Sequence, residues 1–412
     1  MNILLVTPYL PHPRSGHGTG VMVYGMLRQM AARHAVTLVS FCDARERTLA
    51  GDLERLPITV HLVGREKGHG LAGLSRASLA AVRIWQFLGS LVRWEPYFAG
   101  KYRSREMRRL IRRLTSAGKF DVAEFEMAQM GSYAGAARGV PRVLHEHDFT
   151  FRPAYRNYRR RRPGPAKLAA FLEWCRWASY EKRTAREFSA FICVTEQDTA
   201  LVRRIIPGTK ARYLPRGVDL PEPGSSAAVR EPFTLLFVGS FSHAPNADAA
   251  AWLVKDIFPL IAKRFPETNL YIIGADPPRS VHRAAADDPR IRVTGFVDDL
   301  AAYYRRASVL VAPLRFGGGI KMKILHAMAY GIPVVTTGIG LEGIEGRSPE
   351  NLPAGDTAGA VAAQVCRLLA DPAAAATTGA GGAALVRKYY SWERVAGELE
   401  RIYQEAAGSG AR

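Results

Sequence analysis

Residues 311–336 read VAPLRFGGGIKMKILHAMAYGIPVVT, and this stretch says more about the fold than any other part of the chain. An apolar run ends in a proline, and three glycines at 317–319 then lead into Lys321 and Lys323 at the start of a predicted helix. A Gly-Ile-Pro turn closes that helix before a second apolar run at 333–336. The pattern predicts a strand, a glycine-rich loop, a helix and a second strand.

The predicted loop has the chemistry of an anion site. Glycines let backbone amides approach an anion closely, a helix N-terminus supplies positive potential, and Lys321 and Lys323 add full charges. Such a unit is suited to a diphosphate. The same pattern also fits an ordinary strand–helix–strand crossover with solvated lysines, because glycine-rich loops before helices are common. The local sequence leaves both interpretations open.

The length and composition favour two cytoplasmic α/β domains. A chain of 412 residues is too long for one ordinary domain. We expect no signal peptide, since no basic segment precedes the short apolar run after Met1. The longest nearly apolar stretch, 71–94, contains three arginines, which argues against a spanning helix. The four cysteines are scattered without metal-ligand spacing, so we expect neither disulfides nor a zinc site.

Positive charge is concentrated in the first half of the chain. Residues 1–220 contain 37 Lys and Arg against 18 Asp and Glu, whereas the remainder is nearly balanced. The excess lies mainly in 101–113 and in 152–162, the second interleaved with tyrosines. This surface could bind nucleic acid, an anionic membrane or an acidic acceptor, or could simply be solvated. Segment 74–94, apolar with arginines, resembles an interfacial helix and favours a membrane, although a buried core helix fits as well.

Strand and helix patterns alternate in both halves of the chain. In the first half, a loop containing Gly16, Gly18 and Gly20 follows the first strand and precedes a helical segment at 21–33. Open α/β sheets bind ligands at the carboxyl ends of their strands, so this loop is a candidate ligand contact, unless it is only a surface loop. The predicted strands are 2–7, 35–41, 122–126, 142–146, 190–194, 233–238, 269–273, 291–294, 309–312 and 333–336, and a long helix is predicted around 392–406.

Six motifs, in order along nearly the whole chain, resemble one enzyme family. The chain looks like the retaining glycosyltransferases of family 4 (GT4), especially the branch associated with bacterial exopolysaccharide and cell-envelope glycan assembly. The motifs are MNILLVTPYLP with the following GTG, VLHEHD (143–148), PRGVD (215–219), LLFVGSFSHAPNADAAAWLV (235–254), VTGFVDDL (293–300) and GGGIKMKILHAMAYGIPVV (317–335).

The resemblance implies the GT-B fold, in which two Rossmann-like, doubly wound α/β domains face each other across a cleft. We expect an acceptor-binding domain at 1–215, a linker at 216–230 and a nucleotide-sugar-binding domain at 231–390. A C-terminal helix and tail at 391–412 is expected to return to the first domain.

The resemblance also implies a reaction and a set of donor contacts. Enzymes of this kind transfer a sugar from a nucleotide diphosphate to an acceptor hydroxyl with retention of configuration, without a metal or other cofactor. In this sequence, Lys321 and Lys323 match the residues that neutralise the diphosphate. The other matching donor contacts are Gly239, Ser240, Gly318 and Gly319 at the phosphates and Phe296 and Val297 at the base. Gly239 could equally be a turn glycine, and Phe296 and Val297 could be core residues.

On the first domain, His147 matches a histidine that contacts the transferred sugar and helps to position the transition state. The glycines at 16, 18 and 20 would bring backbone amides near the sugar or the phosphate. A lone histidine is usually structural, but His147 has His145, Glu146 and Asp148 as ionisable neighbours at a strand end. No carboxylate can be named as a covalent nucleophile, so the resemblance implies that the leaving phosphate accepts the acceptor's proton.

The chain departs from the family pattern at two glutamates that normally meet the sugar and the ribose. Gly318 and His326 occupy those positions here. A neutral histidine accepts one hydrogen bond where a carboxylate accepts two, at a cost of about 1.5–3 kcal/mol. Glu342 could act as a substitute sugar or ribose contact. Arg216 and Pro245–Asn246 also differ from the usual residues.

We therefore expect a glycosyltransferase at the inner membrane face that uses a nucleotide-sugar donor and a glycan or lipid-linked acceptor. Its basic N-terminal domain would contact the anionic membrane, and nucleic acid is not expected to be a partner. The alternatives are a non-catalytic GT-B scaffold or partner subunit with a degenerate ribose site, and a nucleic-acid binder that uses 152–162.

Overall fold

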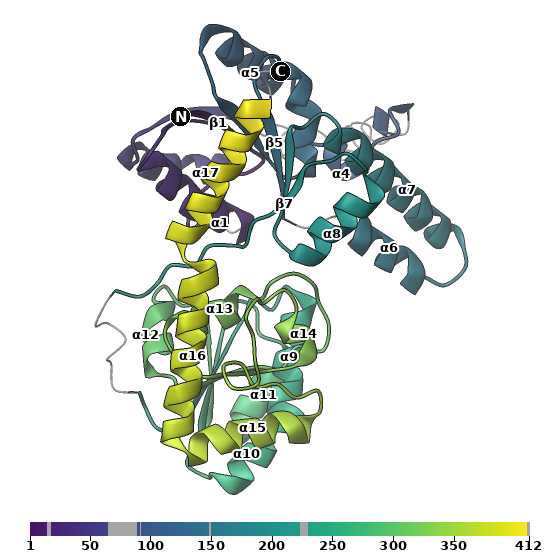
Figure 1. Cartoon of the computed structure of the whole chain (residues 1–412). Coiled ribbons are helices and arrows are strands. Elements are labelled where there is room, and N and C mark those ends of the chain that lie inside the picture. Colours follow the sequence, from purple (N-terminus) through teal and green to yellow (C-terminus); the bar gives the residue numbers. More distant parts are fainter. Residues whose placement is uncertain (15–17, 65–88, 91, 148–149, 223–229, 410–412) are drawn as a thin grey trace. The chain divides into compact units, whose positions relative to one another are not determined.

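The chain divides into two compact α/β units, shown in the computed structural model of Figure 1. The structure describes residues 1–14, 18–64, 89–90, 92–147, 150–222 and 230–409. The first unit consists of Met1–Pro215 together with Val395–Arg412, and the second unit consists of Arg216–Arg394.

The first unit is built on a seven-stranded parallel sheet with the order β3-β2-β1-β4-β5-β6-β7. Its strands are β1 (Asn2–Thr7), β2 (Ala35–Cys42), β3 (Ile58–Gly64), β4 (Val122–Glu126), β5 (Arg142–Glu146), β6 (Ala190–Cys193) and β7 (Ala211–Tyr213). Its helices are α1 (Gly18–Ala31), α2 (Ala44–Arg47), η1 (Ala50–Arg55), α4 (Tyr97–Gly100), α5 (Arg105–Ala117), η2 (Ala128–Ala136), α6 (Phe151–Arg160), α7 (Pro165–Ala185), α8 (Glu196–Ile205) and most of α17 (Trp392–Ser409).

The second unit is built on a five-stranded parallel sheet with the order β10-β9-β8-β11-β12. Its strands are β8 (Thr234–Val238), β9 (Asn269–Ile273), β10 (Ile291–Gly295), β11 (Val309–Ala312) and β12 (Val334–Thr336). Its helices are α9 (Ala244–Trp252), η4 (Leu253–Ile257), α10 (Phe258–Arg264), α11 (Arg279–Asp287), α12 (Leu300–Arg306), α13 (Met322–Ala329), α14 (Gly338–Leu341), α15 (Ala358–Ala370) and α16 (Pro372–Tyr390).

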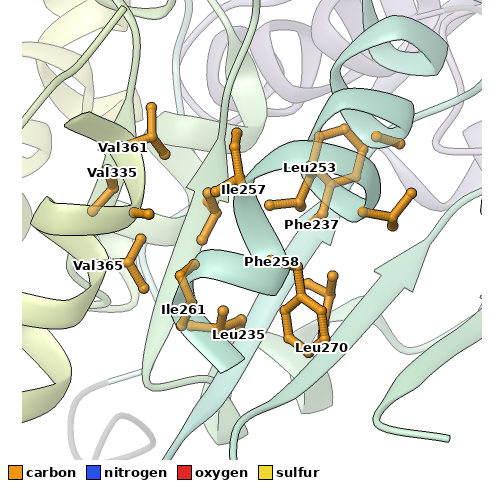
Figure 2. Close-up of a cluster of buried hydrophobic side chains, with 14 of the residues drawn as sticks. Leu235, Phe237, Leu253, Ile257, Phe258, Ile261, Leu270, Val335, Val361 and Val365 are labelled. Carbon is orange, nitrogen blue, oxygen red and sulfur yellow. The ribbon is translucent and has the colours of Figure 1, made fainter. Parts of the chain in front are cut away.

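The strands of the second unit are apolar because helices cover both faces of a parallel sheet. On one face, side chains of β8, β9 and β12 pack against η4, α10 and α15 (Figure 2). Leu235 and Phe237 of β8 belong to this cluster, whereas Leu236 between them belongs to the cluster on the opposite face with α13 and α16. This alternation follows from the two-residue side-chain period of a strand.

Each sheet contains a point where the strand order reverses. In the second unit the chain moves outward from β8 through β9 to β10 and then returns to the other side of β8 with β11 and β12. In the first unit the reversal falls between β1 and β4. Loops at the carboxyl ends of such neighbouring strands diverge and leave room for a ligand, so these two places are where each unit is expected to bind one.

The last helix, α17, packs on the first unit beyond Arg394. Leu399, Ile402 and Tyr403 are fully buried there. Glu400 of α17 accepts hydrogen bonds at 3.1 Å each from Arg33 and His34, which lie between α1 and β2. The expected return of the C-terminal helix to the first unit is therefore confirmed.

Every strand predicted from the sequence is present, with ends shifted by at most one residue. Two further strands, β3 and β7, were missed. The loop predicted at 16–20 is corrected, because Gly18 and Gly20 lie in the first turn of α1. Gly16 lies outside the described residues, as does most of the apolar segment 74–94 for which an interfacial helix was considered.

Candidate functional site

The carboxyl ends of β8 and β11 bring two glycine-containing loops together in the second unit. Gly239 follows β8 and packs against Gly274, which follows β9. A Cβ atom on Gly274 would lie 1.8 Å from the Gly239 carbonyl oxygen, so no other residue fits there. Gly317, in the loop after β11, lies beside Pro245 in the first turn of α9. The predicted residues Gly239, Ser240, Gly318 and Gly319 thus gather at one strand-order reversal.

Lys323 points from the first turn of α13 back toward the loop after β8. Its Nζ atom donates a hydrogen bond to Asn246 Oδ1 at 2.6 Å and lies 4.7 Å from the centroid of the Phe237 ring. A Cβ atom on Gly239 would lie 2.9 Å from the same Nζ atom and 2.8 Å from Asn246 Cγ, so a larger residue there would displace this pair of side chains. Burial lowers the pKa of Lys323 to about 7.

Asn246 is a site residue that the sequence analysis noted only as a departure. Its side-chain amide donates to the Ser240 carbonyl at 2.8 Å while its oxygen accepts from Lys323. It therefore connects the loop after β8 to the lysine of α13. Its position in the first turn of the helix after β8 could have indicated Asn246 as a site residue. Nothing in the sequence indicated that Lys323 is its partner.

Lys321 occupies the N-cap position of α13 and is buried. Its Nζ atom lies 3.6 Å from Glu342 Oε2, and Glu342 is the C-cap of α14, just beyond β12. The predicted grouping of Lys321 with Glu342 on the donor side is therefore present in space. Because the residues come from neighbouring strands β11 and β12, the site is continuous along this edge of the sheet.

The backbone between β11 and α13 is shaped by glycine. Gly317 and Gly319 have φ angles of 133° and 69°, which other residues adopt at a cost. The first N–H groups of an α-helix lack partners within the helix and carry partial positive charge. Gly318, Gly319, the start of α13 and the two lysines therefore form a positively charged edge suited to an anion.

His326 lies one turn further along α13 and is partly buried. Burial lowers its pKa, while the negative charge of Asp219 acts in the opposite direction. Its ring meets the Tyr304 ring edge-on at 6.5 Å. A carboxylate, Asp219 of the PRGVD motif, is thus near the position where the family pattern has glutamate, although it comes from a different segment.

The predicted base contacts follow β10, two strands away from β8. Phe296 is 75% exposed, whereas Val297 packs against the core cluster around α13. An exposed aromatic side chain at the carboxyl edge of a sheet is available to stack on a ligand. Val297 fits its alternative interpretation as a core residue.

His147, at the end of β5, belongs to a buried network in the first unit. Its Nε2 atom lies 2.6 Å from Glu126 Oε2, and both side chains are at most 1% exposed. His145 Nδ1 lies 3.0 Å from Glu124 Oε1 and 3.5 Å from Glu126 Oε1. Tyr403 of α17 donates a hydrogen bond to Glu124.

The charges in this network stabilise one another. Burial opposes the ionisation of Glu126, yet the charges of His145 and His147 hold its pKa at about 2. Burial also opposes a charged His145, but the neighbouring glutamates raise its pKa to about 10. Burial raises the pKa of Glu124. Neither of the two glutamates nor Tyr403 was predicted from the sequence, and a contact of His147 with a sugar stays a prediction.

Glu126, His145 and His147 also have the chemistry of metal ligands. One candidate ligand atom from each lies within 4.8 Å of the others. One ring nitrogen of each histidine lies at an ion-pair distance from Glu126. The contacts within the trio are therefore those of an ion-pair network. The sequence-based expectation of no metal site stays a prediction.

A cavity of about 1000 Å³ lies elsewhere in the second unit, at the amino ends of β8, β11 and β12. Phe233, Ser308 and Pro333 line it together with small residues of α16. It lies at the opposite ends of these strands from Gly239 and Gly319. The edge at β8 and β11 has the glycines and cations that an anion needs.

Comparison with known families identifies the chain. Residues 16–222 match the family model described as Glycosyltransferase Family 4, and residues 232–371 match the model described as Glycosyl transferases group 1. The chain belongs to glycosyltransferase family 4. The family predicted from the six sequence motifs is therefore confirmed. Among the described residues, no helix of this family 4 protein is both long and apolar enough to cross a bilayer.

The curated relatives match only part of the chain. A phosphatidyl-myo-inositol mannosyltransferase from Mycobacterium tuberculosis is 31% identical over 218 residues, which cover 50% of this chain and 57% of the relative. A GDP-mannose-dependent alpha-(1-6)-phosphatidylinositol monomannoside mannosyltransferase from Mycolicibacterium smegmatis is 27% identical over 223 residues, covering 48% and 56%. The chain thus spans little more than half the length of these relatives.

Solved structures show the same fold over nearly the whole chain. HepE from Anabaena, in complex with UDP, has a TM-score of 0.66 at 14% identity and covers 98% of this chain and 100% of its own. Sucrose-phosphate synthase from Thermosynechococcus elongatus has a TM-score of 0.66 at 19% identity, covering 99% and 100%. With two parallel α/β sheets and these neighbours, the predicted GT-B fold is confirmed.

Proposed function

We propose that this protein is a retaining glycosyltransferase that moves a sugar from a nucleotide diphosphate to a lipid-linked or polysaccharide acceptor. It would act at the cytoplasmic membrane face in exopolysaccharide or cell-envelope glycan assembly. The observation that carries the proposal is the convergence of Lys321, Lys323 and two glycine loops at the strand-order reversal of the second unit. Family membership and the names of the relatives support transfer chemistry.

In the proposed reaction, the acceptor hydroxyl attacks the anomeric carbon as the bond from that carbon to the diphosphate oxygen breaks. The acceptor's proton passes to the leaving phosphate, so no carboxylate nucleophile is required. Lys321, Lys323 and the N–H groups at the start of α13 face the negative charge that grows on the diphosphate. Because that charge is larger in the transition state than in the bound donor, these groups lower the barrier as well as hold the donor. The reaction needs no bound metal or cofactor.

One relative is named for GDP-mannose and one structural neighbour holds UDP, so the comparisons support no single base. We propose that Phe296 stacks on the base and that Glu342 or Asp219 takes hydrogen bonds from the ribose or the sugar. His326 would then lie beside the carboxylate that contacts the ribose or the sugar, without making that contact itself.

A second candidate function is a non-catalytic partner subunit. His326 in place of a ribose-binding glutamate and Gly318 in place of a sugar-binding one are the observations that favour it. Such a protein would bind a nucleotide sugar weakly, or not at all, and would turn over none of the donors.

The test is a panel of nucleotide sugars, measured first as thermal stabilisation and then as release of the nucleoside diphosphate with excess chelator present. We expect one donor to stabilise the protein and to be consumed, and NMR of the transferred sugar to show the donor's anomeric configuration. Inversion would contradict the proposed mechanism. Stabilisation without consumption, with any acceptor extract, would support the partner subunit.

A further inference from the structure

The two helices α6 and α7 form a hairpin (Figure 1). They pack side by side in opposite directions, because Tyr155 meets Trp174 at 5.0 Å between ring centroids while Tyr158, one turn later, meets Phe171 at 5.4 Å. None of the α6 residues is fully buried. The hairpin tip, residues 155–171, is therefore a largely exposed structure.

The hairpin is strongly and uniformly basic. Residues 150–172 contain seven Lys and Arg and no Asp or Glu. The basic side chains of the tip are Arg156, Arg159, Arg160, Arg161, Arg162 and Lys167. In the described part of the chain, no acid forms an ion pair with any of these six, so their positive charge is left for a partner.

Apolar side chains are exposed on the same tip. Leu168 is 59% exposed and Phe171 36%, both in the first two turns of α7. Tyr158 and Trp174 stack at an interplanar angle of 2°, and Lys167 Nζ lies 5.3 Å from the Tyr158 centroid. The other ring pairs of the tip meet at tilted angles, and Tyr155 is 39% exposed. Leu168, an aliphatic side chain, is nevertheless the most exposed apolar residue of the tip.

The base of the hairpin is held firmly in the first unit. Glu181 of α7 accepts hydrogen bonds from the backbone N–H groups of Thr150 at 2.8 Å and Phe151 at 3.2 Å, at the start of α6. Arg152 pairs with Asp198 of α8. Anchored at its base, the hairpin presents its tip as a preformed surface rather than a segment that must fold on binding.

We infer that the tip of the α6–α7 hairpin docks on an anionic lipid bilayer, with Leu168 and Phe171 entering the apolar layer and the surrounding arginines binding headgroup phosphates. A basic surface alone would fit nucleic acid equally well. Single-stranded nucleic acid, however, is bound mainly by base stacking on aromatic side chains, whereas the most exposed apolar side chain of this tip is Leu168, on which a base cannot stack. An exposed leucine ringed by arginines fits the boundary between lipid headgroups and acyl chains. Each basic side chain near an anionic surface contributes favourably to binding, and the apolar insertion adds a part that salt does not screen.

The inference rests on the membrane-face location in the proposed function. The measurements below use vesicles without sugar donor or acceptor, so a failure of glycosyl transfer and a failure of membrane docking would be seen separately.

The experiment is sedimentation of the full chain with phosphatidylcholine vesicles containing about 30% phosphatidylglycerol, at about 0.15 M and about 1 M salt. We expect Arg159→Glu/Arg160→Glu to weaken binding at the lower salt by about tenfold or more. The matched control Arg109→Glu/Arg112→Glu makes the same charge change on α5 and should weaken it much less. Neutral phosphatidylcholine vesicles should bind poorly.

Leu168→Ser/Phe171→Ser tests the insertion. We expect this variant to lose about tenfold in affinity and to lose the binding that remains at high salt. The control Leu260→Ser changes a leucine of α10 that is 46% exposed and should bind like the parent. A dye on Leu168→Cys, in a Cys175→Ser background, should shift to the blue with anionic vesicles, and one on Leu260→Cys should not.

Three outcomes would overturn the inference. These are equal losses for the α5 and α6 charge variants, unchanged high-salt binding of Leu168→Ser/Phe171→Ser, and a dye at position 168 that stays in water. Retention of RNA or DNA at the lower salt, without vesicle binding, would assign the tip to nucleic acid instead. Each variant should unfold at the same temperature as the parent protein, which shows that a loss of vesicle binding is not caused by misfolding.

Discussion

Lys323 Nζ lies 2.6 Å from Asn246 Oδ1 and above the ring of Phe237, so its partners are an amide and an aromatic face. Among the described residues no carboxylate pairs with it, and burial lowers its pKa to about 7. A lysine in this state is ready to take a proton when an anion arrives, because a nearby negative charge favours the charged form.

We expect binding of a nucleotide sugar to take up close to one proton at pH 8 and less at pH 6. The diphosphate of a nucleotide sugar does not titrate in this range, so the proton goes to Lys323 as its pKa rises in the complex. Affinity should fall by up to about tenfold per pH unit above pH 7. Calorimetry in two buffers of different ionisation enthalpy measures the uptake.

The matched variant is Lys323→Met, which keeps the volume but cannot titrate. It should bind more weakly and abolish the uptake. If the parent protein bound its donor without proton uptake, or if the methionine variant kept the uptake, Lys323 would not be the titrating group at the diphosphate.

Restoring the glutamate of the family pattern should not help this chain. In His326→Glu a second carboxylate would face Asp219, whose charge already acts on His326. Like charges in a partly buried site repel, so we expect the free energy of unfolding to fall by about 1–3 kcal/mol, with no gain in donor affinity. His326→Gln, which adds no charge, is the control. Urea unfolding measures the stability and donor titration measures the affinity. Tighter donor binding by His326→Glu than by the parent protein would refute the proposal that another carboxylate contacts the ribose.

Tyr403 should secure α17 to the sheet of the first unit. Tyr403→Phe leaves Glu124 without that hydrogen bond in a buried site, which should cost about 1–3 kcal/mol of unfolding free energy. Tyr389→Phe, a half-buried tyrosine of the second unit, is the control and should cost less. Hydrogen exchange should locate the loss in α17, β4 and β5. Equal stability of the two variants would mean that the network does not hold the helix.

The buried carboxyl of Glu181 should make the free energy of unfolding fall as the pH rises, whereas most carboxylates in folded proteins make it rise. Burial raises its pKa from 4.5 to about 8, with backbone N–H groups acting in the other direction. The folded state therefore binds more protons than the unfolded state between these values, and the contribution to stability is lost as the pH rises through 8. The slope approaches about 1.4 kcal/mol per pH unit. Glu181→Gln should remove this part of the pH dependence, and an unchanged slope in that variant would contradict it.

Most of the fold was predictable because buried parallel strands are short apolar runs with clear ends. Val122–Glu126 and Arg142–Glu146 were placed to the residue. The strand β7 has only three residues and no apolar run. The strand β3 lies at the edge of the sheet with mostly half-buried side chains, so it lacks the continuous apolar run of a central strand. Because glycine disfavours helices, the sequence predicts a loop at Gly18 and Gly20, yet α1 begins with them.

The donor-side residues were predictable in type but not in their pairing. A glycine loop before two lysines indicates an anion site, whereas the contact between Lys323 and Asn246 depends on the order in which β8 and β11 pair. The buried network was not predictable, because Tyr403 and Glu124 are separated by 279 residues. Glutamates within a strand give no sign in the sequence that they will face histidines from the next one.

The most direct test of the central claim, that Lys321 and Lys323 hold and activate a sugar diphosphate, is the rate of nucleoside diphosphate release from the donor that stabilises the protein. Excess chelator is present throughout. We predict turnover by the parent protein, a loss of about 10²–10³-fold for Lys323→Met, and a larger loss for Lys321→Ala/Lys323→Met. Both variants should keep the parent's thermal unfolding within a few degrees. Turnover by the double variant at the parental rate would contradict the account.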